Sequence, residues 1–345
     1  MSDGSNTKSQ PFVSIIMPVS NESAFIERSL GSLLAQNYPH GRMEIIIADG
    51  MSTDNTREMI ATIGASAAIP ITIVDNPKRI APTGLNEALK YASGEIIIRV
   101  DGHCEIAEDY VSNCVRLLTG GKADGVGGPI ETIGETGRAA AIAMAMSSKF
   151  GVGGSAFRTV DDREIYTDTV AFPGYTKEII ERAGRFNEEL VRNQDDEYNY
   201  RIRKLGGRIL LSPTIRSRYY SRGTYKSLWR QYFQYGYWKV RVMRLHARQM
   251  SVRQFVPFLF VVSLITTGVL SIFLPPARWA FAAILTAYVI ANLAASVMTA
   301  RKDLSMVPSL SICFAILHFS YGLGFLTGLT AFIANPPKRE LPAES

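Results

Sequence analysis

The stretch Glu95-Ile96-Ile97-Ile98-Arg99-Val100-Asp101-Gly102-His103 indicates the fold class, because an apolar run leads directly into an acid, a glycine and an imidazole. Such a run is typical of a buried parallel strand, and ligands of open α/β sheets bind just beyond the carboxyl ends of the strands. Asp101 and His103 are therefore expected at a ligand site. Gly102 permits a tight turn, so a carboxylate oxygen and an imidazole nitrogen could converge on Mg²⁺ or Mn²⁺. A plain turn that ends the strand is the alternative.

Apolar runs alternate with amphipathic stretches over residues 11–212. This β-α-β-α order predicts a parallel sheet flanked by helices. Neither a Gly-x-Gly-x-x-Gly motif nor a Gly-x-x-x-x-Gly-Lys-Ser/Thr motif follows any of these strands, which argues against dinucleotide oxidoreductases and P-loop enzymes. The predicted strands cover 12–17, 43–48, 69–74 and 95–100, and the predicted helices cover 22–36, 54–63, 82–91 and 107–118.

Polar residues also follow the first two predicted strands, in Pro18-Val19-Ser20-Asn21-Glu22 and in Asp49-Gly50. A nucleotide base needs an apolar slot with an acceptor for its N–H group, which Pro18, Val19 and Asp49 could supply. Helix capping is the alternative role for Glu22 and Asp49.

The phosphates of a nucleotide would need another means of binding, because no glycine-rich phosphate loop is present. A metal ion at Asp101 and His103 could neutralise a diphosphate together with Lys78 or Arg79. This arrangement would suit a nucleoside diphosphate.

A second acidic cluster lies in Asn193-Gln194-Asp195-Asp196-Glu197. Transfer of a group from a diphosphate to an alcohol requires that the hydroxyl lose its proton as it attacks, and a carboxylate within hydrogen-bond reach can accept that proton. The cluster could therefore supply a general base. Acids that merely favour the dipole at the start of a helix are the alternative.

Residues 230–239 interleave aromatic rings with cations ahead of the apolar C-terminal part of the chain. Such a stretch is typical of the belt of Tyr, Trp and Lys at a membrane interface. It could also line an acceptor or diphosphate site. Both interpretations remain open.

Charge is distributed unevenly along the chain. Residues 201–250 contain 13 Lys and Arg and no acid, and three uncharged runs follow, at 255–274, 279–300 and 304–334. About twenty apolar residues cross the bilayer core, so these runs predict two or three transmembrane helices. Cytoplasmic flanks are rich in Lys and Arg, which places the N-terminal part in the cytosol and the 275–278 loop outside. A wholly buried helical core is the alternative.

The ends and the cysteines of the chain add two expectations. Residues 1–6 lack a basic segment followed by an apolar core, so no secretory signal is predicted there. The three cysteines, Cys104, Cys114 and Cys313, show no Cys-x-x-Cys spacing. We therefore expect reduced thiols, with neither a disulfide framework nor a zinc site.

Taken in order, these motifs resemble those of the membrane-associated inverting glycosyltransferases of family 2, which have the GT-A fold. The resemblance covers roughly residues 11–240. Two stretches, 151–158 and 193–197, look most like the succinoglycan-type exopolysaccharide glucosyltransferases. The matching motifs are Pro18-Val19-Ser20-Asn21-Glu22, Asp49-Gly50, Asp101-Gly102-His103, Gln194-Asp195 and Gln234 to Trp238.

The resemblance implies roles for individual residues. In the family the first acid pair grips uracil, the Asp-x-Asp element holds the metal and the sugar diphosphate, and the Glu-Asp element supplies the base. The predicted site assigns catalysis to Asp195, nucleotide-sugar binding to Pro18, Val19, Glu22, Asp49, Arg79 and Asp101, metal binding to Asp101 and His103, and acceptor or diphosphate binding to Asp196, Gln234, Trp238 and Lys239.

Three positions depart from the family pattern. His103 stands where many members have Asp, Gln194 replaces the usual Glu, and Tyr237 replaces the Arg of the Gln-x-x-Arg-Trp element of processive synthases. The missing charge weakens a polymer-synthase interpretation. That charge could instead come from Lys239, Arg241 or Arg230.

We therefore expect a multi-pass enzyme of the inner (cytoplasmic) membrane whose α/β catalytic domain, a GT-A Rossmann-like mixed sheet, faces the cytosol. The resemblance implies transfer of a sugar, with glucose as the leading donor, from a UDP-sugar to a polyprenyl-diphosphate-linked glycan in exopolysaccharide biosynthesis, with Mg²⁺ or Mn²⁺ as cofactor. A processive polysaccharide synthase and a non-enzymatic membrane scaffold or permease subunit are the alternatives. Other polysaccharide-assembly proteins are expected partners, and nucleic acid is not. The expected parts are a disordered 1–10, a catalytic domain at 11–215, a juxtamembrane segment at 216–253, transmembrane helices at 254–335 and a tail at 336–345.

Overall fold

A computed structural model describes residues 10–135, 137–221, 223–301 and 303–334. The chain divides into two compact units. The N-terminal unit comprises Met1–Glu131 and Ala156–Tyr220, and the C-terminal unit comprises Thr132–Ser155 and Ser221–Ser345. The predicted N-terminal disorder and the predicted tail lie outside the described residues.

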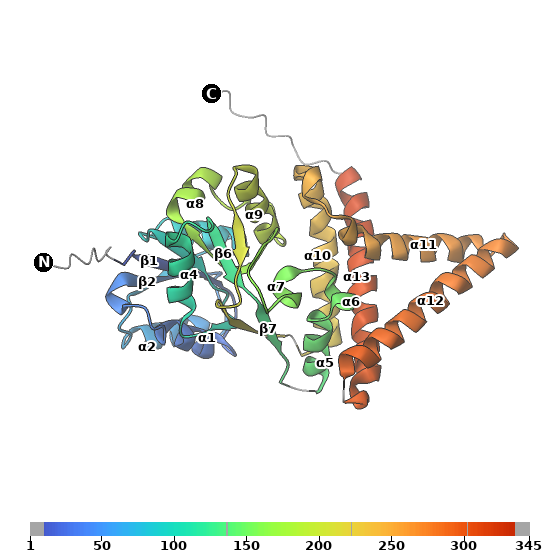
Figure 1. The fold of residues 1–345 in the computed structure, drawn as a ribbon, viewed down its shortest axis with the longest axis horizontal. Helices are drawn as coiled ribbons and strands as arrows, with labels where there is room; N and C mark the ends of the chain where they lie inside the picture. The colour runs from blue at the N-terminus through green and yellow to red at the C-terminus, as the bar shows by residue number, and fades with distance from the viewer. Residues whose placement is uncertain (1–9, 136, 222, 302, 335–345) are drawn as a thin grey trace, which may run out of the picture. The chain divides into compact units, whose positions relative to one another are not determined.

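The first half of the N-terminal unit follows the predicted alternation of strands and helices (Figure 1). All four predicted strands and all four predicted helices are present, with ends that differ by a few residues. Strand β1 pairs in parallel with β2 and β4, and β2 pairs in parallel with β3. The elements are β1 (Val13–Val19), α1 (Ile26–Leu34), β2 (Met43–Asp49), α2 (Thr56–Gly64), β3 (Ile71–Asp75), α3 (Ala81–Leu89), β4 (Ile96–Arg99) and α4 (Tyr110–Thr119).

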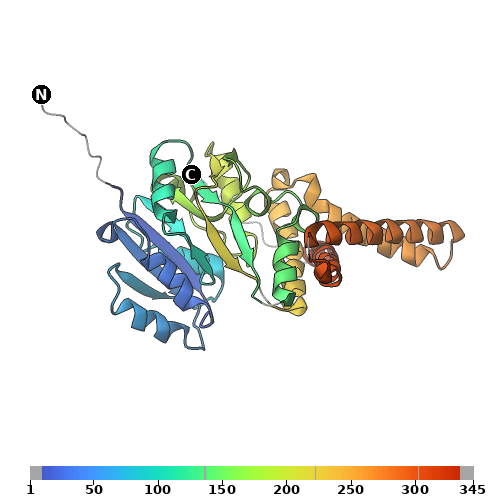
Figure 2. The ribbon, with the colours of Figure 1, turned by 60° about the horizontal axis from the view of Figure 1, so that its bottom comes forward.

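The second half of the N-terminal unit turns this sheet into a mixed one. Strand β9 (Ala171–Thr176) lies antiparallel between β4 and β6 (Gly125–Gly128), and the full order is β3-β2-β1-β4-β9-β6-β10-β8. Figure 2 shows these strands side by side. The other elements are β5 (Cys104–Ile106), β7 (Ile130–Ile133), α7 (Ala156–Thr159), β8 (Ile165–Tyr166), α8 (Lys177–Ala183), α9 (Gln194–Lys204), β10 (Ile209–Leu211) and β11 (Ser217–Tyr220), of which β5, β11 and β7 form a second, smaller sheet.

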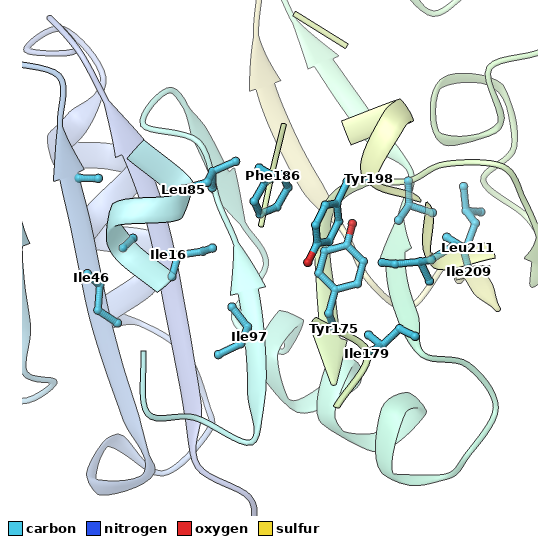
Figure 3. Close-up of a cluster of buried hydrophobic side chains, with 14 of the residues drawn as sticks. Ile16, Ile46, Leu85, Ile97, Tyr175, Ile179, Phe186, Tyr198, Ile209 and Leu211 are labelled. Atoms are coloured by element: carbon cyan, nitrogen blue, oxygen red, sulfur yellow. The ribbon is translucent and has the colours of Figure 1, made fainter. Parts of the chain in front are cut away.

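Helix α9 is fixed to the large sheet by aromatic packing (Figure 3). Tyr198 is fully buried and stacks on Phe186, with the ring centroids 4.0 Å apart. Tyr175 of β9 donates a hydrogen bond to Oδ1 of Asn199 at 2.7 Å. Because these contacts hold the middle of α9, they also fix its first turn, where Asp195 lies.

The C-terminal unit is helical. Among the described residues, three helices are long and apolar enough to cross a membrane, at Val252–Leu270, Pro275–Ala300 and Leu304–Phe332. This agrees with the prediction of two or three transmembrane helices. Helices α11 and α12 form a hairpin (Figure 1). The helices are α5 (Gly137–Met146), α6 (Lys149–Val152), α10 (Tyr225–Leu245), α11 (Val256–Leu270), α12 (Pro275–Ala300) and α13 (Val307–Ala334).

Helix α10, which contains the predicted aromatic and basic stretch, packs closely along α13 (Figure 1). Glycines permit this approach. A Cβ atom added at Gly236 would lie 2.1 Å from the carbonyl oxygen of Tyr321, and one at Gly324 would lie 2.1 Å from that of Phe233. Small residues at such positions allow the backbones of membrane helices to come into contact.

Residues 132–155 pack with the candidate membrane helices, although segments of the N-terminal unit flank them in sequence. His318 on α13 contacts the carbonyl oxygen of Phe150 through Nε2 at 2.8 Å, and Arg253 donates a hydrogen bond to the carbonyl oxygen of Gly154. The N-terminal unit therefore leaves out this segment, whereas the predicted catalytic domain covered the continuous range 11–215.

Candidate active site

The predicted donor-binding residues lie at one edge of the large sheet. Strands β1, β2 and β4 are parallel, so their carboxyl ends share an edge, and Val19 pairs with Asp49 across β1 and β2. The structure therefore brings together the ends of the three strands that the sequence singled out. Pro18 belongs to β1, and Asp101 follows β4 after one residue.

The Asp101-Gly102-His103 turn packs directly on the loop that follows β1. A Cβ atom added at Gly102 would lie 2.9 Å from Cγ1 of Val19 and 3.1 Å from Cγ of Glu22. Only glycine leaves room for this approach. Nδ1 of His103 lies 3.0 Å from Oε1 of Glu22, and the His103 ring also packs edge-on against Tyr219.

The contact between Glu22 and His103 bears on the capping role considered for Glu22 and on the metal-binding role predicted for His103. The backbone carbonyl of Glu22 accepts hydrogen bonds at the start of α1, whereas its carboxylate faces His103. The capping alternative thus does not describe the Glu22 side chain. A carboxylate on Nδ1 leaves Nε2 of the imidazole as the atom that can bind a metal, an arrangement common in metalloproteins. Sequence reasoning placed both residues at the site but did not pair them.

Asp49 is 1% exposed and is held by hydrogen bonds from its own loop. The hydroxyl of Ser52 donates to its Oδ1 at 2.6 Å, and Arg57 pairs with its Oδ2 at 3.2 Å. The N-cap position of α2 is Asn55, so Asp49 does not cap that helix. Asp75 binds the same arginine at 2.6 Å, and this hydrogen bond is the main reason that the pKa of Arg57 is raised.

Arg99, the last residue of β4, joins two of the predicted acids. Its Nε and Nη2 donate to Oδ1 of Asp101 at 3.2 and 2.8 Å, and its Nη1 contacts Oδ1 of Asp195. Two acids that are far apart in sequence therefore share one guanidinium group. Sequence reasoning assigned Arg99 no role, although a charge inside an otherwise apolar strand was a usable signal.

The acids of α9 have separate environments. Glu197 is 2% exposed and pairs with Arg201 at 2.7 Å, and Arg201 also donates to the carbonyl oxygen of Arg185 at 2.8 Å. Glu197 is thus part of a buried ion pair that fixes α9 to the preceding loop. Asp195 instead faces Arg99, and all three acids of the first turn also complement the helix dipole.

Of the two cations proposed for the diphosphate, Lys78 is engaged elsewhere. It pairs with Glu188 at 2.7 Å, and this hydrogen bond is the main cause of a lowered pKa for Glu188. Arg79 lies in the loop before α3 with φ of 59°, and its backbone N–H donates to the carbonyl oxygen of Asn76.

Gln234, Trp238 and Lys239 lie on α10 of the C-terminal unit, whereas Asp196 belongs to α9 of the N-terminal unit. The Trp238 ring contacts Phe332 near the end of α13. Lys239 is buried.

The cysteines do not contribute reactive groups. Cys104, Cys114 and Cys313 are buried free thiols, as expected. Burial raises the pKa of Cys104 well above its usual range, so this thiol next to His103 stays protonated. Within the described ranges, no group of three or more His, Cys, Asp or Glu side chains is arranged to hold a metal.

Comparison with known proteins identifies the family. The family model for glycosyl transferase family 2 matches residues 14–184. The chain is 31% identical over 269 residues to the dolichyl N-acetyl-alpha-D-glucosaminyl phosphate 3-beta-D-2,3-diacetamido-2,3-dideoxy-beta-D-glucuronosyltransferase of Methanococcus voltae, which covers 75% of this chain and 83% of that protein. It is 31% identical over 245 residues to the succinoglycan biosynthesis protein ExoA of Rhizobium meliloti (strain 1021), covering 70% of this chain and 73% of that protein.

A solved structure has a similar fold. The mannosyltransferase PcManGT from Pyrobaculum calidifontis, in complex with GDP-Man and Mn²⁺, gives a TM-score of 0.61 at 21% identity and covers 92% of this chain and 88% of that chain. Together with the relatives, this likeness shows that the chain belongs to glycosyl transferase family 2 and is a glycosyltransferase with a GT-A fold. The resemblance seen in the sequence is thereby confirmed.

Proposed function

We propose that this glycosyltransferase transfers a sugar, with glucose as the leading candidate, from a UDP-sugar to a lipid-linked glycan at a membrane surface, with inversion at the anomeric carbon. One observation carries the proposal. Arg99 holds the acid of the diphosphate motif, Asp101, and the candidate base, Asp195, in a single cluster beyond the strand ends. A donor phosphate and an attacking hydroxyl group need these two acids close together.

The nucleotide base would bind beside Pro18 and Val19, with Asp49 accepting a hydrogen bond from its N–H group. An ionised carboxylate has about four lone-pair sites, so Asp49 can accept this bond besides those from the Ser52 hydroxyl, the Ser52 backbone N–H and Arg57. Arg79 would contact the diphosphate. The preference for uracil rests on the sequence resemblance.

Asp101 and His103 fit a divalent ion, Mg²⁺ or Mn²⁺. One carboxylate and one imidazole leave several coordination positions for phosphate oxygens and water. Glu22 would orient the His103 imidazole through its contact with Nδ1. When bound, the ion would neutralise the charge of the departing diphosphate. The Mn²⁺ in the PcManGT complex supports this assignment.

Asp195 would act as the general base. The proton of the acceptor hydroxyl passes to its carboxylate, while the acceptor oxygen forms the new bond to the anomeric carbon. The bond from that carbon to the diphosphate oxygen breaks, and its electron pair leaves with UDP. A single displacement of this kind inverts the configuration at the anomeric carbon.

The membrane helices would place the acceptor. The basic segment before the first candidate span favours a cytosolic N-terminal unit and attraction to anionic lipid. The name of the Methanococcus voltae relative includes a dolichyl sugar phosphate, which supports a lipid-linked acceptor. Gln234, Trp238, Lys239 and Asp196 are the residues proposed to contact it.

The test is transfer by the purified full-length protein from a panel of UDP- and GDP-sugars to a lipid extract, with products resolved by length and anomeric configuration. We expect one UDP-sugar to add a single inverted residue to a lipid-linked glycan. Long polymer would instead identify a processive synthase. Transfer from no sugar nucleotide, with no hydrolysis of any of them, would refute the proposal.

A further inference from the structure

A single buried arginine contacts both acids on which the proposed reaction depends. The Arg99 side chain is 5% exposed, whereas that of Asp195 is 34% exposed. The guanidinium group is therefore withheld from solvent, while the Asp195 carboxylate remains open to an incoming hydroxyl group. The apolar strand that carries Arg99 is paired on both sides, with β1 and β9.

The chemistry of arginine suits this position. Its planar guanidinium presents N–H donors in a fixed fork, so one side can bind Asp101 while Nη1 binds Asp195. Without this cation, two carboxylates in a partly buried site would repel each other. A lysine ammonium is a compact charge that lacks the fork.

We infer that Arg99 is a positioning residue that holds the Asp195 carboxylate in place for proton acceptance and links it to the acid of the diphosphate site. The inference rests on the proposed function, because it takes Asp195 as the base. Arg99 acts through Asp195. Its contacts with Asp101 would act on donor binding, so the loss of turnover at saturating donor should depend on a functional Asp195.

A double-mutant cycle with the full-length protein tests this dependence. Arg99→Met should lower kcat by about a hundredfold, the scale of lost acid–base assistance. Arg99→Lys should lower it less, by about tenfold, because the charge remains. In the background of Asp195→Asn, adding either Arg99 substitution should change kcat by less than about threefold, because residues that act as a unit are not additive. UDP affinity, measured by calorimetry in excess chelator so that Asp101 holds no metal, should change by less than about threefold.

Arg201→Lys is the matched control. Arg201 forms a buried ion pair on the same helix as Asp195 but contacts neither Asp195 nor Asp101 in the described structure. It should lower the melting temperature and leave kcat per folded molecule near that of the wild type.

Two results would overturn the inference. If Arg99→Lys and Asp195→Asn lower kcat independently, so that their effects multiply in the double variant, Arg99 does not act through Asp195, and the proposed function still stands. If Asp195→Asn alone keeps near-normal turnover, both the base assignment and the inference fail. If Arg99→Met does not fold, Arg99→Lys serves as the Arg99 variant in the double-mutant cycle, because the lysine leaves no uncompensated charge.

Discussion

Removal of the Glu22 carboxylate is expected to weaken Mn²⁺ binding through His103. Nδ1 of His103 lies 3.0 Å from Oε1 of Glu22, and the two side chains are only 20% and 17% exposed. Loss of such a carboxylate partner typically lowers metal affinity by about tenfold to a hundredfold, or about 1.4–2.7 kcal/mol. We expect Glu22→Ala near the upper end. Glu22→Gln should fall near the lower end, because its amide oxygen can still accept from Nδ1–H.

The assay is titration of Mn²⁺ by electron paramagnetic resonance in the presence of UDP, with His103→Ala as the control that removes the imidazole. A second titration measures UDP binding in excess chelator. If Glu22 orients His103, Glu22→Ala lowers Mn²⁺ affinity and leaves metal-free UDP binding unchanged. If Glu22→Ala lowers metal-free UDP binding and leaves Mn²⁺ affinity unchanged, Glu22 binds the uracil ring, as the sequence resemblance implied. The reasoning from the contact between Glu22 and His103 is then refuted.

Further perturbations address the base, the acid stability and the helix packing. Asp195→Asn should keep UDP binding and lower turnover by roughly a hundredfold or more, measured as single-turnover sugar transfer; a change of a few-fold would move the role to Asp196. The hydrogen bond from Thr56 is the main cause that lowers the pKa of Asp54 to about 2. This group therefore contributes stability above its usual pKa of 3.8 that is lost as the pH falls toward 2; Asp54→Asn should reduce the drop in melting temperature over that window, and an unchanged drop would contradict it. Gly324→Val should separate α10 from α13, because its Cβ would lie 2.1 Å from the Phe233 carbonyl oxygen; a melting temperature equal to that of the wild type in detergent would count against the packing.

Strands β1 to β4 and helices α1 to α4 could be predicted because their signals are local, whereas the short strand β5 was not predicted. Each parallel strand is a short apolar run, and each helix shows its own periodicity. Strand β9 lacks that signal. It contains Pro173 and Gly174, and it pairs with strands that lie far away in sequence. Its antiparallel insertion is therefore a property of the sheet as a whole.

The same distinction between local and long-range signals explains which parts of the candidate site could be predicted. Asp101 and His103 could be located because a polar turn follows an apolar strand. The contact between Arg99 and Asp195 could not, because it depends on how Tyr198 fixes α9 over the sheet. The packing of residues 132–155 with the candidate membrane helices is likewise long-range, although the apolar helix Gly137–Met146 was a local signal that could have pointed to it.

The three candidate spans contribute differently to the C-terminal unit. Only 11% of the most apolar window is buried in each of Val252–Leu270 and Pro275–Ala300, against 44% in Leu304–Phe332. The hairpin of α11 and α12 therefore exposes apolar side chains, as expected of helices that cross a membrane. Helix α13 instead packs against α10, α11, α12 and α5, and its glycines serve the contacts with α10 and α11. Hydropathy alone gives these helices the same description, because an apolar side chain that faces lipid and one that faces another helix are chemically alike. The glycines of α13, at positions 322, 324 and 328, are the feature that separates this packing helix from α12, which has none.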